Sequence, residues 1–152
     1  MIIESNIDIS SLLDAHKSLK EAIAQPKNDF IRDSVIQRFE CTYELTWKTF
    51  KRILTGWGKV VNSPKPIFRE IFHEGFIDNL DQWFGFADAR NETVHTYNRK
   101  TAENVYQVAL TFSNELNSVI SKLVTLAINR LWRQVLSFFQ NNKKAQRLYQ
   151  LP

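Results

Sequence analysis

Apolar residues recur along most of the chain at intervals of three and four positions, which is the period of a helix with one buried side. The clearest example lies between residues 31 and 55, where the steps between apolar positions are four, four, four, four, three and four. This apolar stripe consists of Ile31, Val35, Phe39, Tyr43, Trp47, Phe50 and Leu54. The pattern predicts one long helix, which Gly56 and Gly58 are expected to end.

The same spacing predicts shorter helices on both sides of the long one. A first helix is expected to begin at the serine pair 10–11 and to end before Pro26, with His16 packed on its apolar side. A third helix is expected to begin at Ser63–Pro64, because proline suits the first helical position, and to stop at Gly75.

Two more helices are predicted in the second half of the chain. One begins near Asn79 or Asp81 and continues to Tyr97, and the next is capped by Thr101. Nothing obvious breaks this fifth helix before Asn141, so it would be about 60 Å long and would either bend or protrude. Its last apolar residues would then form a surface for self-association or for a partner. They are Leu131, Trp132, Val135, Leu136, Phe138 and Phe139.

Composition agrees with an all-α fold, which we expect to be an up-and-down bundle of four to five helices. The 152 residues are 43% hydrophobic and include only four glycines and four prolines, too few for the many turns of a β fold. We assign residues 1–126 to the bundle domain and residues 127–152 to a basic, partly apolar helical extension. Cys41 is the only cysteine, which excludes an intramolecular disulfide and a zinc site built on paired cysteines.

Neither a signal peptide nor a membrane span is predicted. The first residues lack a basic flank and an apolar run, and no stretch of about 20 uncharged apolar residues occurs. The expected compartment is therefore the cytoplasm.

Charge is divided unevenly along the chain. The first 115 residues carry 14 basic and 16 acidic residues, whereas the part from Leu116 to Pro152 carries six basic residues and no acidic ones. This segment could attract nucleic acid, but taken alone its charge slightly favours a solvated helix end whose cations suit the helix dipole. The candidate nucleic-acid ligands are Lys122, Arg130, Arg133, Lys143 and Lys144.

A polar segment at the end of the predicted fourth helix carries the residues best suited to chemistry. Arg90 offers a planar cationic fork that fits phosphate. Asn91 and His95 are four positions apart, so on a helix the amide can orient the imidazole, and an unperturbed histidine exchanges its proton near neutral pH. Tyr97 adds a hydroxyl and would share one helical stripe with Arg90.

Arginine, histidine and tyrosine without metal ligands are the groups needed for phosphodiester transfer at a ribose 2′-OH. The alternative is an ordinary polar helix end, which the residue types alone favour. The histidines at 16, 73 and 95 lack metal-ligand spacing, and the sequence has no glycine-rich phosphate loop. It also lacks the paired carboxylates with which a nucleotidyltransferase holds two metals, so the chain is not that enzyme itself.

The pattern Arg-x4-His-x-Tyr resembles the motif of HEPN domains, which are all-helical modules that handle nucleotides and RNA. Other segments, in the same order, are similar to the HEPN branch called the nucleotidyltransferase substrate-binding family. These segments are Arg32–Glu40, Thr42, Glu44–Leu45, Trp47–Lys48, Ser63–Lys65, Gly75–Ile77, Trp83, Arg90–Asn91 and His95–Tyr97. The resemblance spans about residues 12 to 123 and leaves out the basic extension.

The resemblance implies a partner and a mode of control. Members of this family pair with a minimal nucleotidyltransferase, and in one description the pair is a toxin and its antitoxin. The HEPN member is then a metal-independent RNase without a cofactor, either an endo- or an exoribonuclease, with tRNA among its candidate targets. By resemblance, Arg90 and His95 are catalytic, Asn91 orients, and Tyr97 receives AMP from the partner, which silences the nuclease.

Two alternatives stay open beside the RNase toxin. The chain could be a non-catalytic substrate-binding subunit of a two-component nucleotidyltransferase, or a plain helical dimerisation module. We favour the nuclease because a binding subunit needs no phenol beside an imidazole. One chain supplies a single histidine and a single arginine, whereas RNA cleavage needs a base, an acid and charge stabilisation, so a homodimer is expected.

Overall fold

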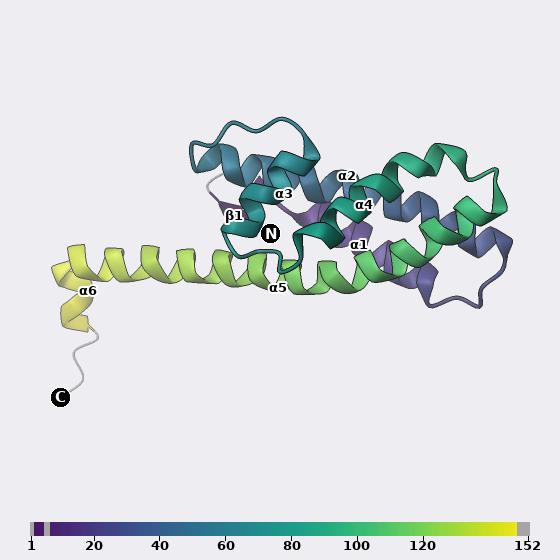
Figure 1. Ribbon diagram of the computed structural model, residues 1–152. Coiled ribbons are helices and arrows are strands. Elements are labelled where there is room, and N and C mark those ends of the chain that lie inside the picture. Colours follow the sequence, from purple (N-terminus) through teal and green to yellow (C-terminus); the bar gives the residue numbers. More distant parts are fainter. Residues whose placement is uncertain (1, 5–6, 149–152) are drawn as a thin grey trace.

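The computed structural model describes residues 2–4 and 7–148, and five helices of this part of the chain form a bundle (Figure 1). The bundle helices are α1 (Ser10–Ile23), α2 (Asp29–Gly56), α3 (Pro64–His73), α4 (Leu80–Glu92) and α5 (Arg99–Asn141). A 3-10 turn, η1 (Thr93–His95), follows α4, and a short helix, α6 (Lys143–Leu148), follows α5. The predicted all-α class and the number of bundle helices are confirmed.

A short antiparallel ribbon precedes the bundle and was not predicted. It pairs β1 (Ile2–Glu4) with β2 (Ile7–Asp8), and strands this short carry no detectable alternation of polar and apolar residues. The ribbon leads directly into α1. At the start of α1, Oδ1 of Asp8 accepts hydrogen bonds from the backbone N–H and the hydroxyl of Ser10 at 2.9 and 2.6 Å.

The core lies along the predicted stripe of α2. Phe39 and Phe50 are fully buried, and the ring of Phe39 meets that of Phe112 on α5 edge to face, with centroids 5.2 Å apart. Trp83 of α4 packs in the same way against Phe68 of α3 at 5.2 Å. Such contacts join all the central helices, because α2 packs against α1, α3 and α5, and α4 packs against α3 and α5.

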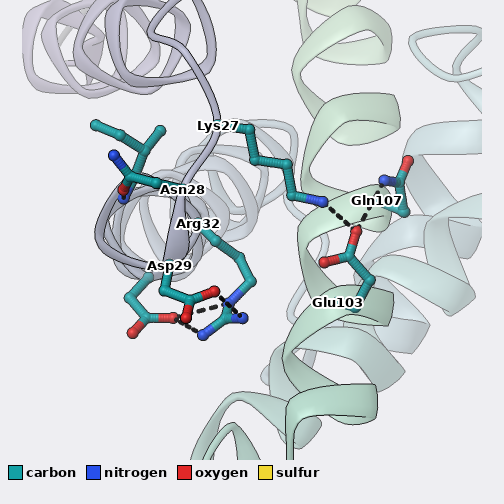
Figure 2. Close-up of polar contacts among 8 residues, drawn as sticks. Lys27, Asn28, Asp29, Arg32, Glu103 and Gln107 are labelled. Atoms are coloured by element: carbon teal, nitrogen blue, oxygen red, sulfur yellow. Dashed lines mark hydrogen bonds and ion pairs between the residues drawn. The ribbon is translucent and has the colours of Figure 1, made fainter.

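Polar contacts hold the connection between α1 and α2 against the start of α5. Figure 2 shows the ammonium group of Lys27 reaching from this connection to the carboxylate of Glu103. The same view shows Arg32 beside Asp29. The guanidinium of Arg32 lies 3.1 Å from the carboxylate of Asp29 and 2.9 Å from that of Asp33. The end of the bundle at which α5 begins is thereby fixed to the end at which α2 begins.

The fourth helix is shorter than predicted, and its last turn changes character. The α-helix ends at Glu92, and the hydroxyl of Thr93 donates to the carbonyl of Arg90 at 2.8 Å. Such threonine bonds compete with the helical pattern. The side chain of Asn98, not Thr101 as predicted, then caps α5 by accepting from the N–H groups of Lys100 and Thr101.

The fifth helix protrudes from the bundle. It has 43 residues, about 65 Å at 1.5 Å per residue, and continues past the other helices without a break (Figure 1). Of the two outcomes left open by the sequence, protrusion is the one observed. Within the described residues, no helix combines the length and the apolarity needed to cross a membrane.

Candidate active site

The side chain of Arg90 crosses from α4 to α2, where two glutamates hold it. Its Nε donates to Oε1 of Glu44 at 3.0 Å, and its Nη2 lies 3.0 Å from Oε1 of Glu40. All three side chains are partly exposed, at 26%, 31% and 37% for Arg90, Glu44 and Glu40. The guanidinium therefore sits at the surface with its orientation fixed from one side.

Glu44 is itself held by neighbours on α2. Its Oε2 accepts a hydrogen bond from Nε1 of Trp47 at 2.9 Å and lies 3.8 Å from Nζ of Lys48. From sequence alone, the row of Glu40, Glu44 and Lys48 would be interpreted as a solvated helix face. That interpretation was incomplete, because nothing in the sequence pairs α2 with Arg90. Two nearby glutamates four positions apart on one helix are the only sequence feature that could have suggested a shared cation.

His95 and Tyr97 lie beyond α4, on the surface of the connection to α5. Their rings meet edge to face with centroids 6.0 Å apart, and Tyr97 is 87% exposed. Because the α-helix ends at Glu92, the prediction that Tyr97 shares a helical stripe with Arg90 is wrong. Asn91 is exposed on the last turn of α4, and in the described part of the chain no hydrogen bond joins its amide to the imidazole of His95. The structure thus brings His95 to Tyr97 and leaves Arg90 with the glutamates.

A cavity of about 640 Å³ opens beside Arg90. It is lined by Tyr43, Glu44 and Trp47 of α2, residues 63–66 at the start of α3, and Ala87, Arg90 and Asn91 of α4. Tyr43 is buried, and burial raises the pKa of its phenol well above the ordinary value. Its hydroxyl therefore stays protonated. The side chain of Tyr97, in contrast to that of Tyr43, is exposed to solvent.

The five candidate nucleic-acid ligands lie on the second half of α5 and on α6. Nζ of Lys122 lies 3.1 Å from Oδ1 of Asp78, so this cation already has a partner in the bundle. Arg133, Lys143 and Lys144 are exposed on α5 and α6, and Arg130 is half-buried. Helix α6 lies at the end of the molecule opposite the connection between α4 and α5 (Figure 1).

The remaining histidines have the structural roles expected of them. His16 is buried, and its Nε2 lies 3.0 Å from the carbonyl oxygen of Ser113 on α5. Burial lowers the pKa of this imidazole. His73 is exposed at the end of α3. Across the described ranges, no three His, Cys, Asp or Glu side chains are grouped so that they could hold a metal ion.

An all-helical bundle that presents Arg-x4-His-x-Tyr at the end of its fourth helix defines the class of protein as HEPN-like. Residues 7–125 match the model of the family described as nucleotidyltransferase substrate binding protein like, and the chain belongs to this family. The name of the family associates it with a nucleotidyltransferase.

Curated and solved relatives agree with this assignment. The chain is 32% identical over 102 residues to Probable ribonuclease HepT of Haemophilus influenzae, a match that covers 62% of this chain and 68% of that protein. A crystal structure of a Thermus thermophilus protein matches with 30% identity and a TM-score of 0.69, covering 74% of this chain and 98% of the other. HI0074 of Haemophilus influenzae, with the fold of a substrate-binding domain of a nucleotidyltransferase, matches at 28% identity and a TM-score of 0.69, covering 76% and 98%.

Proposed function

We propose that the chain is a metal-independent RNase toxin whose partner nucleotidyltransferase silences it by attaching AMP to Tyr97. The observation that carries the proposal is the arrangement at the end of α4. A guanidinium fixed by two carboxylates is followed, within one turn and a short connection, by an exposed imidazole in contact with an exposed phenol. The similarity to Probable ribonuclease HepT supports the same function.

In this mechanism His95 accepts the proton of a ribose 2′-OH, whose oxygen then attacks the adjacent phosphorus. The bond from phosphorus to the 5′-oxygen breaks, which leaves a 2′,3′-cyclic phosphate, and the leaving oxygen takes up a proton. Arg90 stabilises the charge that develops on the phosphate oxygens. Since Glu40 and Glu44 contact its Nη2 and Nε, the substrate phosphate would bind on the Nη1 side of the fork.

A homodimer would complete this site. The described chain offers one imidazole and one guanidinium at the end of α4, and Val94 and Tyr97 there are 66% and 87% exposed. A second copy across a two-fold axis would cover this surface and supply the imidazolium that protonates the leaving oxygen. Sedimentation should then show a dimer or a larger assembly of dimers, and a stable monomer with full activity would contradict this part of the proposal.

The direct experiment is RNA cleavage by the purified full chain in the presence of a chelator. We expect His95→Ala to lose about 10²–10⁴-fold in rate, because general acid–base help has this magnitude. The matched control is His73→Ala, which removes an exposed histidine of α3 outside the site. If His95→Ala purified in the same way cleaves RNA as fast as the wild type, the activity belongs to another residue or to a contaminant.

A cellular experiment tests the toxin part of the proposal. Expression of the chain alone should stop growth, and co-expression of a nucleotidyltransferase from the neighbouring gene should restore it. Growth that is unaffected by the chain alone would contradict a toxin, whatever the outcome of the cleavage assay.

A substrate-binding subunit is the second candidate, and the cavity beside Arg90 favours it. Its 640 Å³ could accept a nucleotide, with Trp47 and Arg90 in its lining. This candidate needs no proton transfer by His95. It predicts that a nucleotide quenches the tryptophan fluorescence of the wild type and of His95→Ala equally, but not that of Trp47→Phe. It also predicts that neither the wild type nor His95→Ala cleaves RNA.

A further inference from the structure

The last third of α5 continues beyond the end of the bundle (Figure 1). Six large apolar side chains on it are between 42% and 62% exposed. They are Ile128, Leu131, Trp132, Val135, Leu136 and Phe138. An apolar face of this extent on a protruding helix is characteristic of an interaction surface.

This face does not continue the side of α5 that the bundle buries. Within the bundle the buried positions of α5 end with Leu116, Val119, Leu123 and Ala127. The next positions in the same direction are polar, namely Arg130, Gln134, Ser137 and Asn141. At about 100° per residue, the exposed apolar face is rotated about 140° around the helix from the buried one. Bending α5 toward its own bundle would therefore bury arginine and amides and leave the apolar face uncovered.

The spacing of the apolar face suits a second copy of the same helix. Positions 128, 131, 132, 135 and 136 of this face, together with the half-buried Phe139, are all apolar and follow the same order of steps in both chain directions, whereas Phe138 lies outside this pattern. In an antiparallel pair centred between Arg133 and Gln134, Ile128 would therefore lie opposite Phe139. The same two-fold axis would place Leu131 opposite Leu136 and Trp132 opposite Val135. Every one of these pairs is apolar, as a self-complementary interface requires.

Charge favours the antiparallel arrangement over the parallel one. The segment after residue 115 carries six cations and no acidic residue, so two parallel copies would bring their basic ends together. Antiparallel copies would instead bring each basic end to the bundle of the other copy. In this register Ala127, where α5 leaves its bundle, lies opposite Gln140 of the second copy. Lys143 and Lys144 follow Gln140 after two asparagines.

The bundle surface at that point is hollowed, and two of its carboxylates, Glu70 and Glu74, share a single cation, Lys59, at 2.7 and 2.9 Å. Glu74 and Phe76 line a cavity of about 340 Å³ together with Lys122, Leu126 and Asn129 of α5. Asp78 is close by, at 3.1 Å from Lys122. The first 115 residues carry a small excess of acidic residues. At each end of the pair, the basic end of one copy would therefore meet the slightly acidic bundle of the other.

We infer that the protruding part of α5, residues 128–141, pairs with the same segment of a second copy in antiparallel orientation. In this pair, α6 of each copy docks on the cavity that Glu74 and Phe76 line in the other copy. This interface is separate from the end of the bundle that carries His95. It also lies outside the family match, which ends at residue 125. The inference does not depend on the proposed RNase activity.

The test measures particle mass by light scattering on the purified full chain. Leu131→Glu with Val135→Glu places two carboxylates in the apolar face and should lower the mass of the particle by a factor of two. The matched control, Gln134→Glu with Ser137→Glu, adds the same charge on the polar side and should keep the wild-type mass. Equal masses of the apolar variant and the wild type, with helical circular dichroism retained in both, would overturn the inference.

A cysteine experiment tests the orientation in a Cys41→Ser background. Ile128→Cys and Phe139→Cys chains, when co-expressed and oxidised, should form a mixed disulfide, while neither should cross-link to itself. Self-cross-linking of each variant would indicate a parallel pair and overturn the proposed orientation. If the wild type is instead monomeric and co-floats with vesicles containing phosphatidylserine, the apolar face binds an anionic membrane and the pairing is overturned.

Discussion

Nε of Arg90 donates a hydrogen bond to Oε1 of Glu44 at 3.0 Å, across 46 positions of sequence and between two different helices. Because Oε2 of Glu44 accepts from Nε1 of Trp47, the carboxylate is itself fixed before it meets the guanidinium. A cation held in this way loses little freedom when a phosphate binds, which is the condition for efficient electrostatic stabilisation of a transition state. Under the proposed function, Glu44 is a positioning residue for Arg90.

Removing this support should therefore lower the rate of RNA cleavage. Glu44→Ala leaves Nε of Arg90 without its acceptor, and we expect a loss of about 10–100-fold in kcat with a smaller change in KM. Glu44→Gln keeps an acceptor oxygen and should retain most of the rate, whereas Arg90→Lys should be poor because an ammonium lacks the planar fork. Glu92→Ala, which removes an exposed carboxylate at the end of α4, is the control. A faster Glu44→Ala enzyme would show that the carboxylates act mainly by neutralising Arg90.

The helices could be predicted from the sequence because one side of each is buried, and burial imposes a period on the residues themselves. The end of α4 could not be predicted in this way. Its change to a 3-10 turn depends on the hydroxyl of Thr93 bonding to a carbonyl and on the cap by Asn98, and neither alters the spacing of apolar residues. The glutamates at Arg90 were missed for a related reason, since a contact between distant helices leaves no mark on either local pattern.

The buried His16 should make the stability of the fold depend on pH. Its Nε2 lies 3.0 Å from the carbonyl oxygen of Ser113, and burial lowers the pKa of the imidazole below that of the unfolded chain. As the pH falls below about 6.5, the unfolded state takes up a proton before the folded state does, so the free energy of unfolding decreases. Above the pKa of the unfolded chain, His16 is neutral in both states, so its protonation no longer lowers the free energy of unfolding.

We expect the urea midpoint of the wild type to decrease between pH 7.5 and pH 5.5 by more than that of His16→Gln. The slope from one histidine is at most about 1.4 kcal/mol per pH unit. His73→Gln should follow the wild type, because His73 is exposed on α3. The same decrease in His16→Gln as in the wild type would assign the pH dependence to other groups.

The basic extension should contribute to RNA affinity if its polar side contacts the substrate. Arg130 and Arg133 lie on the side of α5 away from the apolar face, so pairing of the extension leaves this side accessible. Arg130→Ala with Arg133→Ala should weaken the binding of single-stranded RNA and reduce the slope of log K against log salt by about 1.4. Lys122→Ala should have a smaller effect, since Nζ already lies 3.1 Å from Asp78. An unchanged slope in the double variant would exclude the extension from the RNA site.

Tyr97 should be the residue through which the partner controls the nuclease. The sequence predicted a helical stripe shared by Tyr97 and Arg90, but the structure places the ring of Tyr97 against His95, with centroids 6.0 Å apart. In the transfer, the phenolic oxygen would bond to the α-phosphorus of ATP, pyrophosphate would leave, and the phenolic proton would pass to a base. The adduct would then bring a negative phosphate and a purine over the imidazole, and would exclude RNA by both charge and volume.

Tyr97→Phe should therefore cleave RNA at nearly the wild-type rate and stay toxic when the nucleotidyltransferase is co-expressed, because the ring contact is kept and the acceptor oxygen is lost. Mass spectrometry of the co-expressed wild type should find AMP on Tyr97. Tyr106→Phe is the control and should remain subject to modification, since Tyr106 is buried beneath Lys27. If Tyr97 carries no AMP and His95→Ala is as toxic as the wild type, the nuclease proposal fails. The cavity beside Arg90 would then make a substrate-binding subunit the better explanation of the fold.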